Sequence, residues 1–459
     1  MIVSRDWAGK RYAVLGLARS GAATVSALLE GGARVVAWDS DPAKREALAP
    51  LPFRGGAGGG ALPQTLPPEG APHPNPSPEG EGLDFIDLDT LDLSGFDALV
   101  VSPGVPLNTH PLAAAARAAG VPVIGDIELF AQARHDLPPH KVVGITGTNG
   151  KSTTTALVHH ILKTAGVPTL MGGNIGLPIL GQEPLPEGGV YVLELSSYQI
   201  DLTQSLDCDV AVLLNITPDH LDRYDGFEGY AASKARLFAM QSAGHVAVVG
   251  AGDEASANIA QGLAGRTDDL VTIAPGMIDQ TRWPALQGPH NAQNAQAAIA
   301  VARALGIAKD VIEAGLRTYA SLPHRMQHVA TRNGVAFVND SKATNPDSTA
   351  PALAAFPRVH WIVGGKRKGD DLDACTAHLD HVVAAYTIGE AAPLFFDLLK
   401  DKVPVVEQSG TLEAAVAHAA AAAQPGDTVL LSPACASFDQ FRDYEARGDA
   451  FRAAVEVLA

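Results

Sequence analysis

The chain has 459 residues and a mass of 47.5 kDa, with 33 Lys and Arg against 50 Asp and Glu, which gives a formal net charge of −17. At roughly 150 residues per domain, this length predicts about three domains. The acidic balance excludes a general nucleic-acid binder, which needs a basic face, but it is compatible with a local cleft for small anions.

The cysteines and the N-terminus favour a soluble cytoplasmic protein. Cys208, Cys375 and Cys435 lie far apart and form no CxxC pair, so they predict neither a disulfide framework nor a zinc site. The residues before the short apolar run 12–17 carry no secretory leader pattern, and no stretch approaches ~18 uninterrupted apolar residues. We therefore expect no membrane contact.

In chain order, short apolar runs that suit strands alternate with Ala-rich helical stretches. The first unit is a strand, a glycine turn and a helix start over 11–21, a helix over 22–29 and a strand over 33–39. Further strands are expected at 97–104, 141–145, 189–195, 209–215, 245–250, 358–365 and 427–433, with a helix at 154–165. Continuous apolar strands separated by helices predict parallel sheets covered on both faces. Pro and polar residues at 135–141 and 322–325 predict joints between domains.

One segment fits no domain. Residues 54–82 contain 8 Gly and 7 Pro in 29 positions and almost no large apolar side chain. Such a segment buries too little surface to offset its ordering entropy, so we expect a disordered Pro/Gly insertion at the surface.

The strongest chemical signal follows the strand expected at 141–145. It is the run Gly147, Thr148, Asn149, Gly150, Lys151, Ser152 and Thr153. Backbone N–H groups of a glycine turn at a helix N-terminus cradle phosphates, a Lys neutralises their charge, and a Ser or Thr hydroxyl can bind Mg²⁺. The strict GxxxxGK[ST] spacing is missed, because Gly144 lies six residues before Gly150. The context nevertheless predicts an ATP site.

A weaker glycine motif occupies residues 16–21 near the N-terminus. Ala18 replaces the middle glycine that lets a dinucleotide pyrophosphate approach, although Asp39 follows at the end of the second strand. A nucleotide or phosphate placed differently, a nicotinamide dinucleotide and a purely structural turn all remain open here.

Several segments resemble the Mur ligase family. They are GTNGKST, YVLELSSYQ (191–199), NITPDHLDRY (215–224), YAASKARLF (230–238), HNAQNAQAA (290–298), LPHRMQ (322–327), VNDSKATNP (338–346), IVGGKRKGDD (362–371) and LLSPACASFDQF (430–441). The resemblance extends over the whole chain except 54–82. It implies an α/β protein of three domains: a Rossmann-like uridine-nucleotide-binding domain at 1–136, a central P-loop ATPase domain with a mainly parallel sheet at 137–322, and a Rossmann-like amino-acid-binding domain at 323–459.

The resemblance also implies an activity. Within the family, the chain is most similar to enzymes that join D-glutamate to UDP-N-acetylmuramoyl-L-alanine in peptidoglycan precursor synthesis. ATP first converts the alanyl carboxylate to an acyl phosphate, which the amine then attacks. ATP is a co-substrate, Mg²⁺ is expected at two sites, and we expect a monomer. A folylpolyglutamate synthase-like ligase, another Mur ligase, a nucleotide-binding regulator and an NAD oxidoreductase are the alternatives. The paired DSKATN and SPACASFDQF segments favour the D-glutamate ligase.

The matching positions imply roles for individual residues. The catalytic set is Lys151, His220 and Lys234, and the ATP set adds Asn291, Asn294, Arg325 and Asp340 to the 147–153 loop. Ser152, Glu194, His220 and Lys234 would hold metal, with Lys234 carrying a CO₂-derived carbamate. From the residues alone, Glu194 could instead cap a helix, and His220 and Lys234 could be surface or packing residues. Asn291 and Asn294 are three apart, so a helix would place them on one face.

The two remaining substrates have their own implied sets. Uridine-sugar positions are Arg19, Ser20, Asp39, Ser40, Ser102 and Gly104, with Asn174 from the central domain. D-glutamate positions are Lys342, Thr344, Lys368, Ser437, Phe438 and Tyr444. A dicarboxylate needs two separate cationic or hydrogen-bonding anchors, which this second set could supply.

Overall fold

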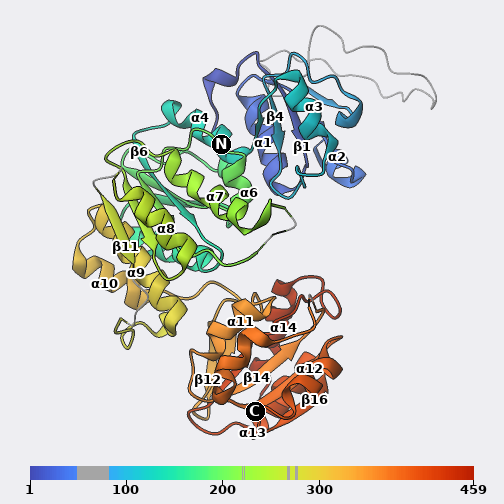
Figure 1. Cartoon of the computed structure of the whole chain (residues 1–459), viewed down its shortest axis with the longest axis vertical. Helices are drawn as coiled ribbons and strands as arrows, with labels where there is room; N and C mark the ends of the chain where they lie inside the picture. The colour runs from blue at the N-terminus through green and yellow to red at the C-terminus, as the bar shows by residue number, and fades with distance from the viewer. Residues whose placement is uncertain are drawn as a thin grey trace, which may run out of the picture.

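The fold is known from a computed structural model that describes residues 1–48, 82–219, 221, 223–265, 269–273, 278–367 and 369–458. Its strands form three sheets, one after another along the chain. Figure 1 shows the N-terminal sheet at one end of the long axis, the central sheet in the middle and the C-terminal sheet at the other end.

The N-terminal sheet has the strand order β3-β2-β1-β4-β5, and its pairs are parallel. Its strands are β1 (Arg11–Leu15), β2 (Arg34–Trp38), β3 (Leu83–Phe85), β4 (Ala98–Val101) and β5 (Val123–Ile124). Its helices are η1 (Arg5–Trp7), α1 (Arg19–Glu30), α2 (Pro42–Leu48), η2 (Leu88–Thr90), α3 (Pro111–Ala119), α4 (Asp126–Ala133) and η3 (Arg134–Asp136). The order reverses between β1 and β4, so their carboxyl ends open the crevice where such sheets bind ligands.

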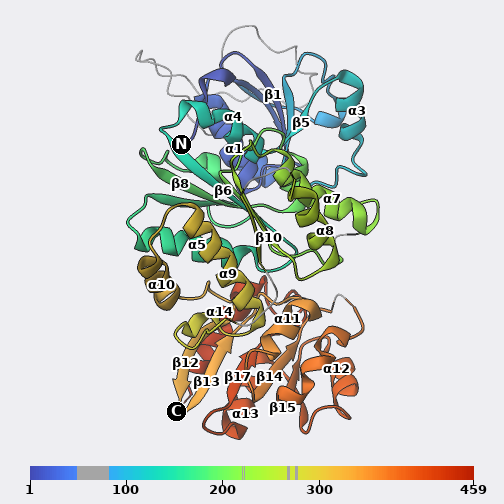
Figure 2. The same cartoon turned by 60° about the vertical axis from the view of Figure 1, so that its left-hand side comes forward.

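The central sheet has the order β11-β10-β9-β6-β8-β7, again with parallel pairs. Its strands are β6 (His140–Thr146), β7 (Thr169–Gly173), β8 (Gly189–Glu194), β9 (Val210–Leu213), β10 (Val246–Gly250) and β11 (Leu270–Ile273). Its helices are α5 (Lys151–Thr164), η4 (Ile179–Gly181), α6 (Ser197–Asp201), α7 (Gly226–Ala239), α8 (Glu254–Leu263), η5 (Pro284–Leu286), α9 (Pro289–Ala304) and α10 (Lys309–Thr318). Figure 2 shows α7 and α8 on one side of this sheet, with α5, α9 and α10 on the other.

The C-terminal sheet has the order β12-β13-β17-β14-β15-β16. Its strands are β12 (Gln327–Arg332), β13 (Val335–Asn339), β14 (Val359–Gly364), β15 (Val382–Ile388), β16 (Val406–Gly410) and β17 (Thr428–Leu431). Its helices are α11 (Pro346–Leu353), η6 (Asp373–His381), α12 (Ala392–Leu399), α13 (Leu412–Ala422) and α14 (Tyr444–Glu456). Successive residues of β14 face opposite sides: Trp361 packs with α11 and α12, and Ile362 with α13 and α14.

The buried cores distinguish the three parts. One apolar cluster runs without a break from the N-terminal sheet through Phe130 of α4 to Tyr191 of β8. The rings of these two residues meet edge to face with centroids 5.0 Å apart. The C-terminal sheet instead has a cluster of its own on each face. The N-terminal and central parts are therefore packed as one body, and the C-terminal part has a separate core.

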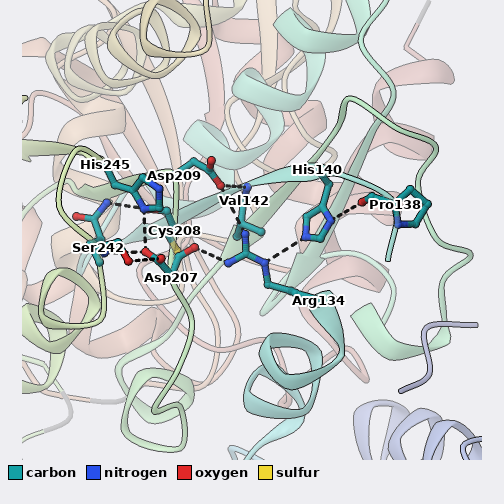
Figure 3. Close-up of polar contacts among 10 residues, drawn as sticks. Arg134, Pro138, His140, Val142, Asp207, Cys208, Asp209, Ser242 and His245 are labelled. Atoms are coloured by element: carbon teal, nitrogen blue, oxygen red, sulfur yellow. Dashed lines mark hydrogen bonds and ion pairs between the residues drawn. The ribbon is translucent and has the colours of Figure 1, made fainter. Parts of the chain in front are cut away.

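A polar network ties the joint after α4 to the amino edge of the central sheet (Figure 3). Arg134 donates to His140 Nε2 at 3.1 Å and forms an ion pair with Asp209 at 3.6 Å. Asp209 also accepts the backbone N–H of Val142, at 2.9 Å. Beside it, Asp207 pairs with His245 at 2.8 Å. This network fixes the joint at the edge opposite the glycine loop.

The expected α/β class with mainly parallel sheets is confirmed, with one exception. β12 pairs antiparallel with β13, because a short turn at Asn333 and Gly334 joins them directly without a crossover helix. The helix after the glycine loop begins at Lys151, three residues earlier than expected. The insertion expected at 54–82 lies outside the described residues except for Gly82. The domain boundaries stay predictions. Among the described residues, no helix combines the length and apolar character needed to cross a membrane.

Candidate active site

The glycine loop joins β6 to α5 at the carboxyl edge of the central sheet. Gly150 caps α5 with φ +83°, and a Cβ there would lie 2.3 Å from Asn294 Oδ1, so this position requires glycine. Asn215, just after β9, accepts the N–H of Thr148 through its backbone oxygen at 2.9 Å and that of Asn149 through Oδ1 at 2.8 Å. The loop is thus preformed at a helix N-terminus, where anions bind.

Two lysines converge on one carbonyl of this loop. Lys151 Nζ donates to the oxygens of Gly147 at 2.9 Å and Thr148 at 2.8 Å, and Lys234 Nζ donates to Gly147 at 3.0 Å. Lys234 is 1% exposed and lies over the Tyr230 ring, 4.6 Å from its centroid. Burial lowers the pKa of Lys151, and burial together with the charge of Lys151 lowers the pKa of Lys234 well below its ordinary value. Burial and the charge of Lys151 therefore disfavour the charged form of Lys234, at the position where the resemblance predicts a carbamate.

Glu194 ends β8 beside the loop and is 2% exposed. Its Oε1 accepts Asn174 Nδ2 at 2.9 Å, but its Oε2 is buried with no hydrogen-bond partner among the described residues. A buried carboxylate oxygen of this kind is expected to face a cation. Ser152, also predicted for metal, accepts Arg325 Nη2 at 2.8 Å.

The predicted second-metal ligand His220 lies outside the described residues. Within the part of the chain that is described, no group of three or more His, Cys, Asp or Glu side chains could hold a metal ion. Such a group would in any case not include Lys234 or Ser152, whose donor atoms belong to other residue types.

The predicted ATP residues of the central part meet the C-terminal part in one pocket. Its lining includes Asn149, Gly150, Thr153, Asn215, His290, Asn291, Asn294, Arg325, Asp340 and Lys342. As expected, Asn291 and Asn294 share the buried face of α9, with Asn294 Nδ2 donating to Asn291 Oδ1 at 3.1 Å. Asn294 Oδ1 in turn accepts the hydroxyl of Thr154 at 3.2 Å, which ties α9 to α5.

Arg325 lines this pocket from the connection to the C-terminal part, and Asp340 lines it from the end of β13. His324 and Met326 flank Arg325 with φ of 61° and 44°, both in the left-handed region that side chains disfavour. Asp340 accepts the N–H of Met326 at 3.1 Å and the hydroxyl of Ser432 at 2.9 Å. Burial nevertheless raises the pKa of Asp340 to about 7.

The predicted D-glutamate residues gather in the C-terminal part. Lys342 Nζ lies over the Tyr444 ring, 3.7 Å from its centroid. Ser437 is buried at 2% exposure, whereas its neighbour Phe438 is 67% exposed, and Thr344 is partly buried. Lys368 lies outside the described residues.

The predicted uridine-sugar residues lie at the carboxyl edge of the N-terminal sheet. Asp39 Oδ2 accepts the N–H of Leu17 at 2.7 Å. Burial opposes its charge, but hydrogen bonds from Leu17, Asp41 and Lys44 hold its pKa below the ordinary value. Ser102 donates to Gly16 at 2.9 Å. Ser20 and Ser102 line one small pocket, and Arg19, Ser40 and Gly104 are exposed nearby in the chain. Asn174 lies apart from them, directly after β7 of the central sheet.

Three residues at these edges were not singled out by the sequence. Asn215 accepts two backbone N–H groups of the glycine loop. A polar residue directly after an apolar strand could have indicated a site residue from sequence. Asp126 faces the same small pocket as Ser20 and Ser102 with its buried Oδ1 unpartnered among the described residues, and burial raises its pKa to about 6. Arg447 is 1% exposed and donates to the oxygens of Ser341 at 2.8 Å and Cys435 at 3.0 Å, although in sequence it looks like any exposed helical arginine.

Comparison with solved structures identifies the same architecture. The MurF ligase from Thermotoga maritima in complex with ADP aligns with a TM-score of 0.58 over 99% of this chain and 97% of that chain, at 14% identity. The UDP-N-acetylmuramate-alanine ligase MurC from T. maritima aligns with a TM-score of 0.55 over 97% of this chain and 99% of its own, at 16% identity. At these identities the likeness concerns the fold alone.

Sequence comparisons go further. The Mur ligase middle domain matches residues 145–283, and the Mur ligase glutamate ligase domain matches 324–435. A UDP-N-acetylmuramoylalanine--D-glutamate ligase from Novosphingobium aromaticivorans is 61% identical over 100% of this chain and 97% of its own length. A protein of the same name from Sphingopyxis alaskensis is 60% identical over the whole of both chains. With a glycine loop set in a three-sheet fold and relatives this similar over its full length, the chain belongs to the Mur ligase family.

Proposed function

We propose that the protein is an ATP-dependent ligase that joins D-glutamate to UDP-N-acetylmuramoyl-L-alanine in peptidoglycan precursor synthesis, releasing ADP and phosphate. The relatives at 56–61% identity carry the name of this activity. The observation that supports it best is the pocket in which Asn149 and Gly150 of the glycine loop face Arg325, Asp340 and Lys342. Phosphoryl transfer depends on positioning and on electrostatic stabilisation, and this arrangement supplies both from two parts of the chain.

The glycine loop would hold the phosphates of ATP. The backbone N–H groups at the start of α5 and the Lys151 ammonium would offset their charge, and Asn291 and Asn294 would contact the adenine from α9. Arg325 donates to Ser152, so its guanidinium is near enough to the glycine loop to contact the phosphates of ATP. Asp340, in the same pocket, would accept a hydrogen bond from a ribose hydroxyl. Because these groups come from both parts, bound ATP would hold the parts together and keep water from the acyl phosphate.

The residues present fit Mg²⁺. Glu194 Oε2 is a buried acceptor without a hydrogen-bond partner in the described part of the chain, and the Ser152 hydroxyl is a second oxygen donor. Glu194 and Ser152 would hold the first ion and His220 with Lys234 the second. The metal would screen the negative charge that builds up on the transferred phosphoryl group.

Lys234 fits the predicted carbamate for a chemical reason. Its lowered pKa increases the fraction of neutral amine, which is the form that attacks CO₂. The carbamate replaces a buried cation by a carboxylate and relieves the repulsion from Lys151. Lys234 therefore would supply an oxygen ligand where its ammonium could bind no metal.

The other substrates would enter from opposite sides. The carboxyl edge of the N-terminal sheet, with Arg19, Ser20, Asp39, Ser40, Ser102 and Gly104, would hold the uridine diphosphate sugar. Lys342, Thr344, Lys368, Ser437, Phe438 and Tyr444 would hold D-glutamate, whose amine must reach the acyl phosphate at the glycine loop. All of these groups belong to one chain, which supports the proposal of a monomer. ATP and a nucleotide sugar as substrates support the proposal that the reaction takes place in the cytoplasm.

The test is phosphate release with ATP, UDP-N-acetylmuramoyl-L-alanine and either D-Glu, L-Glu, L-Lys or L-Ala. Of these four amino acids, we expect only D-Glu to support turnover. Lys151→Ala should lower the turnover rate by a factor of about 10³ or more, because the phosphate-binding cation is removed. Release with L-Glu and a folate, and not with the nucleotide sugar, would assign the chain to the folate branch and overturn the proposal.

A further inference from the structure

Asn174 and Glu194 are joined at two points on the carboxyl edge of the central sheet. β7 and β8 pair in parallel with Gly173 opposite Glu194, so Asn174 is the first residue beyond the pair. The backbone N–H of Asn174 donates to the Glu194 carbonyl at 2.8 Å, and Nδ2 donates to the Glu194 carboxylate at 2.9 Å. Asn174 thus binds Glu194 twice, once through the main chains and once through the side chains.

The local sequence enforces this approach. Gly173 has φ +87°, and a Cβ at this position would lie 2.1 Å from the carbonyl oxygen of Glu194. Only glycine allows the two strand ends to come this close, and the close approach is what brings the next residue, Asn174, to the carboxylate.

The contact makes the two carboxylate oxygens of Glu194 unequal. Oε1 accepts the Asn174 amide, whereas Oε2 is buried and has no hydrogen-bond partner in the described ranges. An amide N–H that donates to one oxygen fixes the rotation of a carboxylate, and it leaves the other oxygen, which shares the negative charge, as an acceptor for another ligand. Asn174 is exposed as a residue, whereas Glu194 is buried, so the contact joins a surface residue to a buried carboxylate.

We propose that Asn174 is a positioning residue that turns Oε2 of Glu194 toward a divalent cation. The inference rests on the metal-binding role of Glu194 in the proposed function. The resemblance assigns Asn174 to the uridine-sugar substrate, but the geometry gives its amide N–H to Glu194. Partners of this kind orient a ligand carboxylate, and their loss typically weakens metal binding by about 10- to 100-fold.

The test is binding of Mn²⁺ to the full-length protein in the presence of ADP, followed by the electron paramagnetic resonance signal of free Mn²⁺. We compare the wild type with Asn174→Ala, Asn174→Leu and Glu194→Gln. Leu keeps the branched shape of Asn and removes the donor. The matched control is Gln182→Ala, whose amide donates to Met171 and Leu177 at 2.9 and 3.0 Å in the same region and does not touch Glu194.

We expect both Asn174 variants to raise the Mn²⁺ dissociation constant by about 10- to 100-fold, and Gln182→Ala to change it less than about twofold. In turnover, the Mg²⁺ concentration for half-maximal rate should rise in the Asn174 variants. The KM for the nucleotide sugar at saturating Mg²⁺ should stay within about twofold of the wild type.

The contrary outcomes are distinct. If Glu194→Gln loses Mn²⁺ affinity and both Asn174 variants keep it, the positioning role is wrong while the metal role of Glu194 stands. If Glu194→Gln also keeps its affinity, the metal assignment in the proposed function fails. A raised KM for the nucleotide sugar with unchanged Mn²⁺ binding makes Asn174 a substrate contact only, and the inference is overturned.

Discussion

At the scale of single residues, Asp340 shows how a buried binding group costs stability. Burial raises its pKa to about 7, against about 4 in an unfolded chain. Because the folded pKa is the higher one, the folded state is favoured most below about pH 4, and this contribution is lost as the pH rises through 7. The shift of about three units corresponds to at most roughly 4 kcal/mol. We expect Asp340→Asn, which cannot ionise, to become increasingly more stable than the wild type from pH 5 to pH 8 in urea unfolding.

Asp347→Asn is the control for this comparison, because Asp347 lines the same pocket but is exposed. Its unfolding free energy should follow the wild-type pH dependence in parallel. If the unfolding free energy of Asp340→Asn also runs parallel to that of the wild type from pH 5 to pH 8, Asp340 does not carry the buried charge.

Sequence alone anticipates the residues of this site whose role follows from local spacing. The glycine loop is visible as a run, and the three-residue spacing of Asn291 and Asn294 places them on one helical face. Arg447 shows where such reasoning stops. Its guanidinium donates to Ser341, which lies 106 residues away in sequence, and to Cys435 in the connection before its own helix. Only the tertiary fold brings these two acceptors together.

At the scale of elements, the joint between α4 and β6 depends on a neutral histidine (Figure 3). His140 Nε2 accepts Arg134 Nε at 3.1 Å, so Nδ1 carries the proton and donates to Pro138 at 2.8 Å. Burial lowers the pKa of His140, and the charge of Arg134 lowers it further, although Asp209 opposes this. Because the folded pKa is the lower one, the contact stabilises the protein above about pH 6.5 and is lost as the pH falls through the folded pKa.

We therefore expect His140→Phe to reduce the loss of unfolding free energy between pH 7.5 and pH 5.5. Urea unfolding at several pH values measures this. His328→Gln, at an exposed position of β12, should leave the wild-type dependence unchanged. An unaltered slope in His140→Phe would mean that the joint does not titrate in this range.

Elements differ in how well the sequence predicts them. Buried strands such as β8 and β14 are continuous apolar runs, and they lie where the pattern places them. β12 was not expected as a strand, because it is an edge strand of mixed polarity, QHVATR, held by pairing with β13. Its antiparallel direction follows from the short turn at Asn333 and Gly334, which joins it directly to β13. A strand of mixed polarity lacks the continuous apolar run that predicts parallel pairing.

At the scale of the whole molecule, the arrangement of the apolar cores predicts which parts of the chain unfold together. Phe130 and Tyr191 belong to one cluster that joins the N-terminal and central sheets, while Phe395 belongs to the separate core of the C-terminal sheet. Between the two bodies runs the connection around Arg325, whose guanidinium donates to Ser152 at 2.8 Å. A continuous apolar core couples the unfolding of two parts strongly, and polar contacts between separate cores couple it weakly.

We therefore expect two transitions in differential scanning calorimetry. Phe130→Ala and Phe395→Ala are a matched pair, because both remove a buried ring of at most 1% exposure at a cost of about 3–5 kcal/mol. Phe130→Ala should lower the midpoint of the transition that belongs to the N-terminal and central body, and Phe395→Ala only that of the C-terminal body. If the wild type melts in a single transition that both variants shift equally, the three sheets unfold as one unit. The C-terminal part would then be coupled to the others far more strongly than its separate core implies.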